Sequence, residues 1–316
     1  MDRSPRRRPL KVGLQLPEAE YVAPWSSMLA MARLAEEAGF DSLWVGDHLL
    51  YEDGNGTVKG VWEAWSLLAA LAAVTERIEL GPLVACTGFH NPAMIAKKAT
   101  TIDEISGGRF VLGLGAGWNE AEYRAFGFPY DHRVSRFEEA FTIIRTLLDD
   151  GFIDFHGTYY QVERCTLLPR GPRPGGIPLM IGSSRPRMLR IALPFVQSWN
   201  AWFADFDNRA DKLPPILAGI DAACREVGRD PATLERTCAI LVAMSGAVGR
   251  SAAYRPDSPL RPHGGTTEEL TTVIRAFAAV GISHLQVVLD PITEAAIAEF
   301  APVLERLDRG DVMEEG

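Results

Sequence analysis

Two adjacent residues with chemically versatile side chains, Asp47 and His48, follow a short apolar run. A histidine exchanges a proton near neutral pH, and a carboxylate beside it can hold it in place or orient a bound ring. The same dipeptide can also be an aspartate that caps a loop next to a histidine with ordinary structural hydrogen bonds. The position of the pair in the fold decides between these interpretations.

A second candidate is the segment 182–184, Gly-Ser-Ser, which precedes a helix signalled by Pro186. A glycine admits a ligand closely, and hydroxyls and the first amides of a helix donate hydrogen bonds, so the segment indicates an anion site. A helix start contributes at most about 2 kcal/mol to holding an anion, whereas micromolar affinity requires about 8 kcal/mol. An apolar pocket, lined by Trp118, Trp199 and Trp202, must therefore supply the remainder. Simple helix capping by the serines is the alternative.

The run from Gly113 to Gly117 alternates glycine with other residues, but no helix of the dinucleotide-binding type directly follows it. Its glycines indicate that a ligand approaches the backbone closely. Glu120 and Glu122 come next; they can act as catalytic acids, although a solvated helix face is the stronger expectation. Cys86 is expected to be a small buried side chain rather than a nucleophile, because no obvious base accompanies it.

Each of these candidates follows the end of an apolar run with strand character, and helical segments lie between the runs. The expected strands cover residues 12–16, 42–45, 78–84, 110–114, 178–181, 198–201, 238–242 and 284–289. The expected helices cover residues 24–38, 61–75, 91–106, 135–148, 186–193, 208–227, 268–280 and 293–307. This alternation predicts a parallel sheet whose outer face is covered by helices.

A closed (β/α)8 TIM barrel fits this pattern best, because closure leaves no strand edge; a doubly wound open sheet is the alternative. Long insertions are expected after strands 2, 4 and 7, at residues 47–60, 151–177 and 246–266. The second should contain a β-hairpin, and the last two should cover the substrate side. Chemistry in such a barrel lies at the carboxyl ends of the strands, which strengthens the catalytic interpretation of Asp47 and His48.

The composition limits the function classes. The 316 residues carry 32 Lys and Arg against 41 Asp and Glu, and this net charge of −9 argues against a general nucleic-acid binder. The four cysteines, with no CxxC, argue against a disulfide framework and a structural metal site. No apolar stretch is long enough to span a membrane. We expect residues 1–9 to be a disordered basic tail and residues 10–316 to be a single domain of a cytoplasmic protein.

Several motifs in order along the chain resemble the luciferase-like monooxygenase superfamily, and within it the coenzyme F420-dependent oxidoreductases. The resemblance covers roughly residues 12 to 202. It is carried by AEEAGFDSLWV (35–45), Asp47-His48, Asn91-Pro92-Ala93, IDEISGGRF (102–110), GLGAGWNE (113–120), PLMIG (178–182) and Trp199-Asn200. Each motif is modest, but the ordered set is specific. Trp118 stands where the sugar-phosphate dehydrogenases of the family carry a glutamate, which weakens the case for that substrate class.

The resemblance implies a barrel that binds FMN or the deazaflavin coenzyme F420 at the carboxyl ends of its strands, and a homodimer. Asp47 and His48 match positions that contact cofactor or substrate. The other implied contacts form three groups: a bulge in strand three under the ring, with a cis peptide bond between its first two residues; a segment lining the cofactor; and a phosphate loop. In that order they are Leu83, Val84, Ala85; Gly115, Ala116, Gly117, Asn119; and Gly182, Ser183, Ser184.

Charge near the phosphate loop bears on the choice of cofactor. The deazaflavin carries an acidic oligoglutamate tail, which the net charge of −9 opposes, but salt confines this repulsion to about 8 Å. Arg170, Arg173, Arg185 and Arg187 flank the loop in sequence and can reach such a tail; a solvated arginine face is the alternative. We therefore favour F420 over FMN.

We expect hydride transfer between F420 and a small unsaturated or carbonyl substrate, with His48 exchanging the proton and Asp47 holding it or the ring. With FMN the enzyme would be a two-component monooxygenase. The alternative from another functional class is a flavin-binding protein without turnover. Such a protein needs no polar groups over the ring, so the presence of Asp47 and His48 argues mildly against it. A metal-dependent hydrolase needs ligands at several strand ends, where besides Asp47 and His48 only His284 or Asp290 qualify, so no metal is expected.

Overall fold

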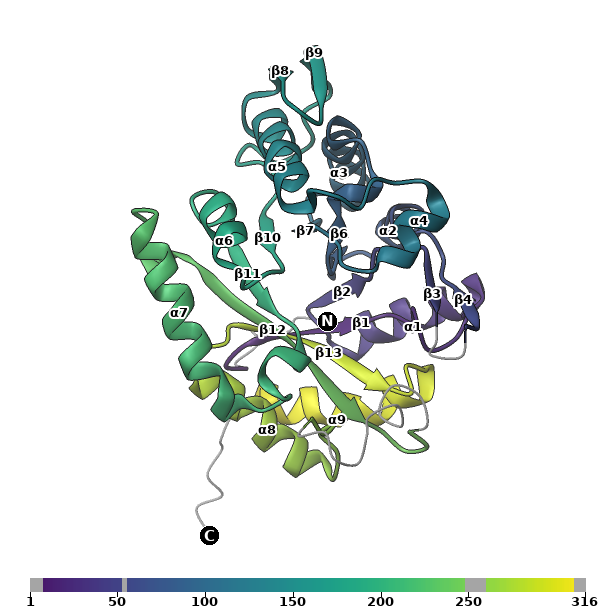
Figure 1. The fold of residues 1–316 in the computed structure, drawn as a ribbon. Helices are drawn as coiled ribbons and strands as arrows, with labels where there is room; N and C mark the ends of the chain where they lie inside the picture. Colours follow the sequence, from purple (N-terminus) through teal and green to yellow (C-terminus); the bar gives the residue numbers. More distant parts are fainter. Residues whose placement is uncertain (1–7, 53–55, 248–259, 310–316) are drawn as a thin grey trace.

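Parallel strands curve into a nearly closed barrel with helices on its outside (Figure 1) in the computed structural model, which describes residues 8–52, 56–247 and 260–309. The strands of the barrel lie in the order β5-β2-β1-β13-β12-β11-β10-β7-β6. β5 covers most of the expected third strand, which breaks at Leu83 and Val84, and β6 continues it two residues beyond the expected end. A bridge between Leu80 and Phe110 joins β5 to the chain that enters β7. The expected (β/α)8 architecture is confirmed.

The strand positions agree with the expected ones to within a few residues at their ends. The barrel strands are β1 (Lys11–Gln15), β2 (Ser42–Val45), β5 (Glu79–Pro82), β6 (Ala85–Cys86), β7 (Leu112–Gly115), β10 (Leu179–Ile181), β11 (Ser198–Ala201), β12 (Glu235–Ala243) and β13 (His284–Asp290). Two hairpins lie outside the barrel and are formed by β3 (Leu50–Glu52) with β4 (Val58–Gly60), and by β8 (Phe152–His156) with β9 (Gln161–Thr166).

The helices include one that the pattern did not predict, α4. The α-helices are α1 (Trp25–Ala38), α2 (Ala64–Val74), α3 (Pro92–Ser106), α4 (Glu120–Phe126), α5 (Arg133–Asp150), α6 (Pro186–Ala192), α7 (Leu213–Glu226), α8 (Thr267–Ala279) and α9 (Glu294–Arg309). Short 3-10 helices are η1 (Thr87–Phe89), η2 (Phe203–Phe206), η3 (Ala210–Lys212) and η4 (Pro231–Thr233). Across the described ranges, none of these helices combines the length and apolar character that crossing a membrane requires.

The start and stop signals in the sequence act as predicted. Asn91 caps α3, because its side chain accepts a hydrogen bond from the Met94 amide, and Pro92 occupies the first turn. Gly39 ends α1 in the left-handed conformation, with φ 97°, and its amide donates to the carbonyls of Ala35 and Glu36. These caps fix where each helix returns the chain to the barrel.

A hydrogen-bonded layer fills the amino-terminal end of the barrel. Trp44 Nε1 lies 2.7 Å from Ser42 Oγ, which lies 2.7 Å from His284 Nε2. Gly13 faces this layer, and a Cβ there would stand 2.1 Å from Ser42 Oγ. Burial lowers the pKa of His284 to about 3, so the imidazole is neutral. Because His284 begins β13, it lies at the end of the barrel away from the candidate site.

The insertions differ in where they lie. The stretch after β2, where an insertion was expected, contains the β3–β4 hairpin. Residues 151–177 follow α5 and so start at the amino-terminal end of the barrel; the β8–β9 hairpin runs along α5, and Glu139 of that helix accepts hydrogen bonds from the Thr158 and Tyr159 amides of its turn. The stretch 151–177 begins and ends at the amino-terminal end of the barrel, away from the substrate side. The prediction that it covers the substrate side is therefore wrong for its first and last residues. Most of the expected insertion at 246–266 lies outside the described residues.

One residue of the expected basic tail is fixed to the barrel. The guanidinium of Arg8 donates to Asp308 at 2.7 Å and to Asp41 at 3.2 Å, and its side chain is 4% exposed. The expected boundary at residue 9 is therefore too late, because these two carboxylates hold the chain from Arg8 onward. Residues 1–7 lie outside the described residues.

Candidate active site

Four neighbouring strand positions bring the sequence candidates to one end of the barrel. β2 pairs with β5, β6 with β7, and β7 with β10, all in parallel. Because the carboxyl ends of parallel strands meet at one edge, the segments that follow them lie next to one another: 47–48, 83–86, 115–119 and 182–184. The structure thus gathers all the predicted site residues at the end where barrel enzymes carry out their chemistry.

Val84 lies in the middle of this end, surrounded by glycines. A Cβ added to Gly113, Gly115 or Gly182 would stand 2.9, 2.8 or 3.0 Å from a methyl carbon of Val84. The peptide bond between Leu83 and Val84 is cis, as the resemblance implies. The glycines let the backbone close around Val84, and the result is a floor of small residues at the barrel mouth.

Gly117 has a separate reason to be glycine. Its φ is 75°, and a Cβ there would stand 2.3 Å from Tyr123 Oη and 2.4 Å from Cys86 Sγ. Tyr123 Oη donates to the Ala116 carbonyl at 2.8 Å and lies 3.0 Å from Cys86 Sγ. Asn119 immediately precedes α4, and its side chain donates to the Leu50 carbonyl at 3.3 Å, which ties the segment to the β3–β4 hairpin. The lining segment is therefore held rigidly from behind.

The loop at 182–184 is anchored from below and open above. Trp199 Nε1 donates to the Ser183 carbonyl at 3.0 Å, and Ser183 Oγ accepts a hydrogen bond from the Arg185 amide at 3.3 Å. No side chain caps α6, and Ser184 is exposed. The prediction that Trp199 lines a pocket is wrong, because its side chain is fully buried under the loop.

Asp47 is buried at the centre of a polar network behind the floor, in contact with His90 and Cys86. Its Oδ2 accepts a hydrogen bond from the Cys86 amide at 2.9 Å and lies 2.9 Å from His90 Nε2. The carboxylate therefore attaches the end of β2 to the bulge formed by residues 83–86. Its observed contacts are structural ones, so it positions the floor rather than exposing an oxygen to a ligand.

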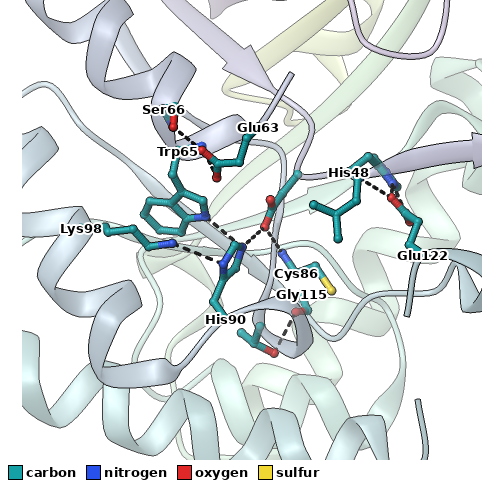
Figure 2. A network of polar contacts seen from close by, with 12 residues as sticks. His48, Glu63, Trp65, Ser66, Cys86, His90, Lys98, Gly115 and Glu122 are labelled. Atoms are coloured by element: carbon teal, nitrogen blue, oxygen red, sulfur yellow. Dashed lines mark hydrogen bonds and ion pairs between the residues drawn. The ribbon is translucent and has the colours of Figure 1, made fainter. Parts of the chain in front are cut away.

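His48 contacts a different carboxylate, that of Glu122. Its Nδ1 lies 3.0 and 3.1 Å from the two carboxylate oxygens (Figure 2). Glu122 also accepts a hydrogen bond from the Leu49 amide at 2.6 Å, and it is 1% exposed. His48 remains 18% exposed and contacts the rings of Tyr51 and Trp118. The pair therefore has a buried acid behind a histidine that solvent can reach.

The pKa of His48 is set by opposing effects. Burial by itself lowers it, but the hydrogen bond to Glu122 and the negative charges of Glu18, Glu122 and Asp47 together raise it above 6.5. A histidine held in this way through Nδ1 has Nε2 as its exchanging nitrogen. The arrangement resembles the acid–histidine pairs that orient a proton-transferring imidazole.

The expectation that Glu122 lies on a solvated helix face is wrong. Glu120 is exposed and pairs with Arg124, whereas Glu122 points to the barrel because it begins the buried side of α4 together with Tyr123. The missing signal was the helix itself. Once α4 is recognised, Glu122 falls on the side facing away from Glu120 and Arg124, which lie one turn apart.

The cysteine at the site agrees with its sequence interpretation. Burial and the neighbouring Asp47 raise the pKa of the Cys86 thiol to about 12, against a smaller opposing effect of its hydrogen bond with Tyr123. The thiol packs against Phe89 and Tyr123. A protonated, enclosed thiol is not a nucleophile.

The four arginines expected near the loop divide between the two ends of the barrel. Arg170 donates to the Leu148 and Asp149 carbonyls at the end of α5, and Arg173 pairs with Asp103 near the end of α3. Both contacts lie at the amino-terminal end of the strands, so these two side chains do not flank the loop and that prediction is wrong. Arg185 and Arg187 do flank it, and Arg187 pairs with Glu138 at 2.6 Å.

Comparison with protein families gives a match over most of the chain. The profile of the family described as luciferase-like monooxygenase matches residues 10–254. A 5,10-methylenetetrahydromethanopterin reductase of Archaeoglobus fulgidus is 34% identical over 184 residues, which are 58% of this chain and 50% of the reductase. A pyrimidine monooxygenase RutA of Cronobacter sakazakii is also 34% identical, over 64% of this chain and 56% of that protein. The chain thus matches only about half the length of these relatives.

Other comparisons cover more of the partner protein. An F420-dependent glucose-6-phosphate dehydrogenase of Kineococcus radiotolerans is 29% identical over 72% of this chain and 67% of that enzyme. Among solved structures, an F420-dependent secondary alcohol dehydrogenase in complex with an F420-acetone adduct superposes with a TM-score of 0.79 at 21% identity, covering 93% of this chain and 98% of that one. At that identity the structural likeness establishes the fold.

Proposed function

The chain belongs to the luciferase-like monooxygenase family, and on that premise we propose that it is an F420-dependent oxidoreductase in which His48 exchanges the proton. Membership of this family and the similarity to a reductase and a dehydrogenase support an oxidoreductase. The observation that carries the proposal is the pairing of solvent-accessible His48 with buried Glu122 beside the floor around Val84.

The residues at the barrel mouth fit a flat ring with an anionic chain. The close approach of Gly113, Gly115 and Gly182 to Val84 leaves no Cβ above the floor, so a planar group can lie against backbone and a valine methyl. The loop at 182–184, with an exposed hydroxyl and no side-chain cap on α6, can donate hydrogen bonds to a phosphate. The residues proposed to hold the cofactor are completed by Leu83, Ala85, Ala116, Gly117 and Asn119.

A bound deazaflavin supplies a hydride-transferring carbon. The chain itself supplies orientation and a proton: Glu122 holds His48 Nδ1, so Nε2 gives or takes the proton that accompanies hydride transfer. Asp47 holds the Cys86 amide and thereby the bulge under the ring. Trp118 and Tyr51, which contact the His48 ring, limit how water reaches it.

We favour F420 because of one relative, the F420-dependent glucose-6-phosphate dehydrogenase, which carries this dependence in its name. It is similar to this chain over 72% of this chain's length. Of the four arginines expected beside the loop at 182–184, Arg185 and Arg187 do lie there and could contact the acidic tail of F420. FMN is the second candidate, since the pyrimidine monooxygenase RutA is 34% identical. In that case the same floor would hold an FMN ring, and the protein would be a monooxygenase.

Titration of the purified protein with F420 and, separately, with FMN tests the proposal. We expect F420 to bind in the micromolar range or tighter, with a change in its ring fluorescence, and FMN to bind at least tenfold more weakly. Tighter binding of FMN would replace the deazaflavin assignment by the monooxygenase. Binding of neither would remove the proposed function.

A further inference from the structure

Trp118 exposes a large apolar ring beside the proton-exchanging histidine. It is 66% exposed, whereas Trp44, Trp65 and Trp199 are buried in the core. The centre of its ring lies 5.8 Å from that of His48, and the two planes meet at 69°. An indole that stays in water at the mouth of a barrel offers apolar area that a ligand can bury.

A second ring, that of Tyr51, lies on β3 and also contacts His48. The two ring centres are 4.6 Å apart, with an angle of 39° between the planes. The β3–β4 hairpin that carries Tyr51 lies next to α4, which directly follows Trp118 and Asn119 (Figure 1). Tyr51 and Trp118 therefore form an aromatic wall beside the imidazole, although they are far apart in the sequence.

Hydrogen bonds of the backbone fix this aromatic wall in place. Tyr130 Oη donates to the carbonyl of Trp118 at 3.1 Å. The side chain of Asn119 donates to the Leu50 carbonyl at 3.3 Å, so the residue after Trp118 is tied to the residue before Tyr51. Because these contacts lie within the chain, a ligand does not have to order the wall when it binds.

The charges around His48 limit what the aromatic wall can bind. Glu18, Glu122 and Asp47 are the charges that act most strongly on His48, and all three are negative. They repel a carboxylate or phosphate on a ligand. A cationic ligand gains little from Glu122 and Asp47, because both are buried and already accept hydrogen bonds from backbone amides. An uncharged ligand fits this surface best.

We propose that Tyr51 and Trp118 bind the substrate, and that the substrate is an uncharged molecule with a flat apolar ring next to the carbonyl group or double bond that reacts. The proposal rests on the proposed function, because it takes His48 to exchange the proton. The reacting group then lies at His48 Nε2 while the ring of the substrate lies against the indole. Trp118 is thus a specificity-determining residue.

The first test follows the indole N–H signal of Trp118 by NMR while acetophenone, an uncharged aromatic ketone, is added. The protein is saturated with F420, or with FMN if that is the one that binds. The chain has seven tryptophans, and Trp118→Phe identifies the signal by its loss. We expect this signal to shift until it saturates, and the signal of exposed Trp62, whose indole nitrogen donates to the Ala23 carbonyl, to stay in place. An unmoved Trp118 signal, or equal shifts at both tryptophans, overturns the proposal.

The second test compares dissociation constants. 4-Acetylbenzoate adds a carboxylate to the same ketone and should bind the wild type at least about tenfold more weakly. Trp118→Ala should weaken acetophenone binding about tenfold or more, and Trp118→Phe should stay within about threefold because it retains a ring. Trp62→Ala is the matched control and should bind like the wild type. Equal binding of the two ketones, or unchanged acetophenone binding in Trp118→Ala, refutes the assignment.

Melting temperature and cofactor titration separate a structural role of Trp118 from a role in binding substrate. Because the residue is exposed, Trp118→Ala should melt within about 2 °C of the wild type and bind the cofactor as tightly. Weakened cofactor binding would assign the ring to the cofactor and not to the substrate. If the wild type binds neither cofactor, the proposed function fails, and acetophenone titration of the unliganded protein decides the role of the aromatic wall by itself, since the contacts that fix the wall lie within the chain.

Discussion

Substitution of Glu122 by glutamine tests the proton-exchanging pair most directly. The buried carboxylate accepts from His48 Nδ1 at 3.0 Å and from the Leu49 amide at 2.6 Å, and glutamine keeps its size while removing its charge. A hydrogen bond to a charged group is worth about 1.5–3 kcal/mol, and one pKa unit corresponds to about 1.4 kcal/mol. Burial alone lowers the pKa of His48, so removing the charge of Glu122 should bring this pKa down from its raised position above 6.5.

The measurement is an NMR titration of the histidine ring signals between pH 4 and pH 9. The chain has six histidines, and His48→Asn identifies the relevant signal. Glu120→Gln is the matched control, because Glu120 lies on the same helix, is exposed and pairs only with Arg124 at the surface. It should leave the pKa of His48 unchanged. An unchanged His48 pKa in Glu122→Gln would refute the argument that the buried carboxylate raises it.

The same pair predicts how stability depends on pH. The folded-state pKa of His48 is raised above the unfolded value near 6.5, so the pair stabilises the fold below pH 6.5 and this contribution disappears as the pH rises through the raised pKa. The difference in unfolding free energy between wild type and Glu122→Gln should therefore be largest near pH 5.5 and smaller near pH 8.5. Turnover, once a substrate is known, should fall about tenfold to a hundredfold with cofactor affinity nearly unchanged.

Three further predictions follow from the packing and burial of single residues. In Gly115→Ala the new Cβ would stand 2.8 Å from a Val84 methyl carbon, so this variant should bind the cofactor at least tenfold more weakly in a fluorescence titration. Gly219→Ala on α7 is the control, because no atom lies within 4 Å of its Cβ. It should leave cofactor binding unchanged and stabilise the fold by about 0.5–1 kcal/mol. The Cys86 thiol, whose pKa burial raises to about 12, should resist iodoacetamide in the native protein at pH 8; rapid alkylation seen by peptide mass spectrometry would contradict its burial. Because the pKa of folded His284 is lowered to about 3, the wild type should lose stability as the pH falls from 6.5 toward 3, and the decline should be smaller in His284→Gln in urea unfolding.

Local signals in the sequence were sufficient for the elements and their order. Helix caps such as Asn91 with Pro92 and Gly39 act within one turn of the chain, so they need no tertiary contact to be recognised. Continuous apolar strands between helices require burial on both faces, and a closed parallel barrel provides it. The ends of strands then placed Asp47, His48 and the loop at 182–184 on one side of the molecule.

Short irregular elements were beyond these signals. α4 has only 7 residues, too few for a helical period to stand out, and the third strand is broken at Val84. Without α4, Glu120 and Glu122 look alike in the sequence. In the structure Glu120 pairs with Arg124 at the surface, whereas Glu122 is 1% exposed. Trp199 was placed at a pocket for a similar reason, since a strand residue can face either side of the barrel.

The sequence by itself determined the alternation of strands and helices, the caps that end them, and which segments follow the strand ends. Only the tertiary structure decided which carboxylate serves which histidine, Glu122 with His48 and Asp47 with His90, because these partners are 74 and 43 residues apart. The tertiary structure also places Arg170 and Arg173 at the amino-terminal end of the barrel, although both lie close to residues 182–184 along the chain. Hydrogen bonds and ion pairs depend on distances of a few ångströms, and those distances are fixed by how the barrel closes rather than by separation in sequence.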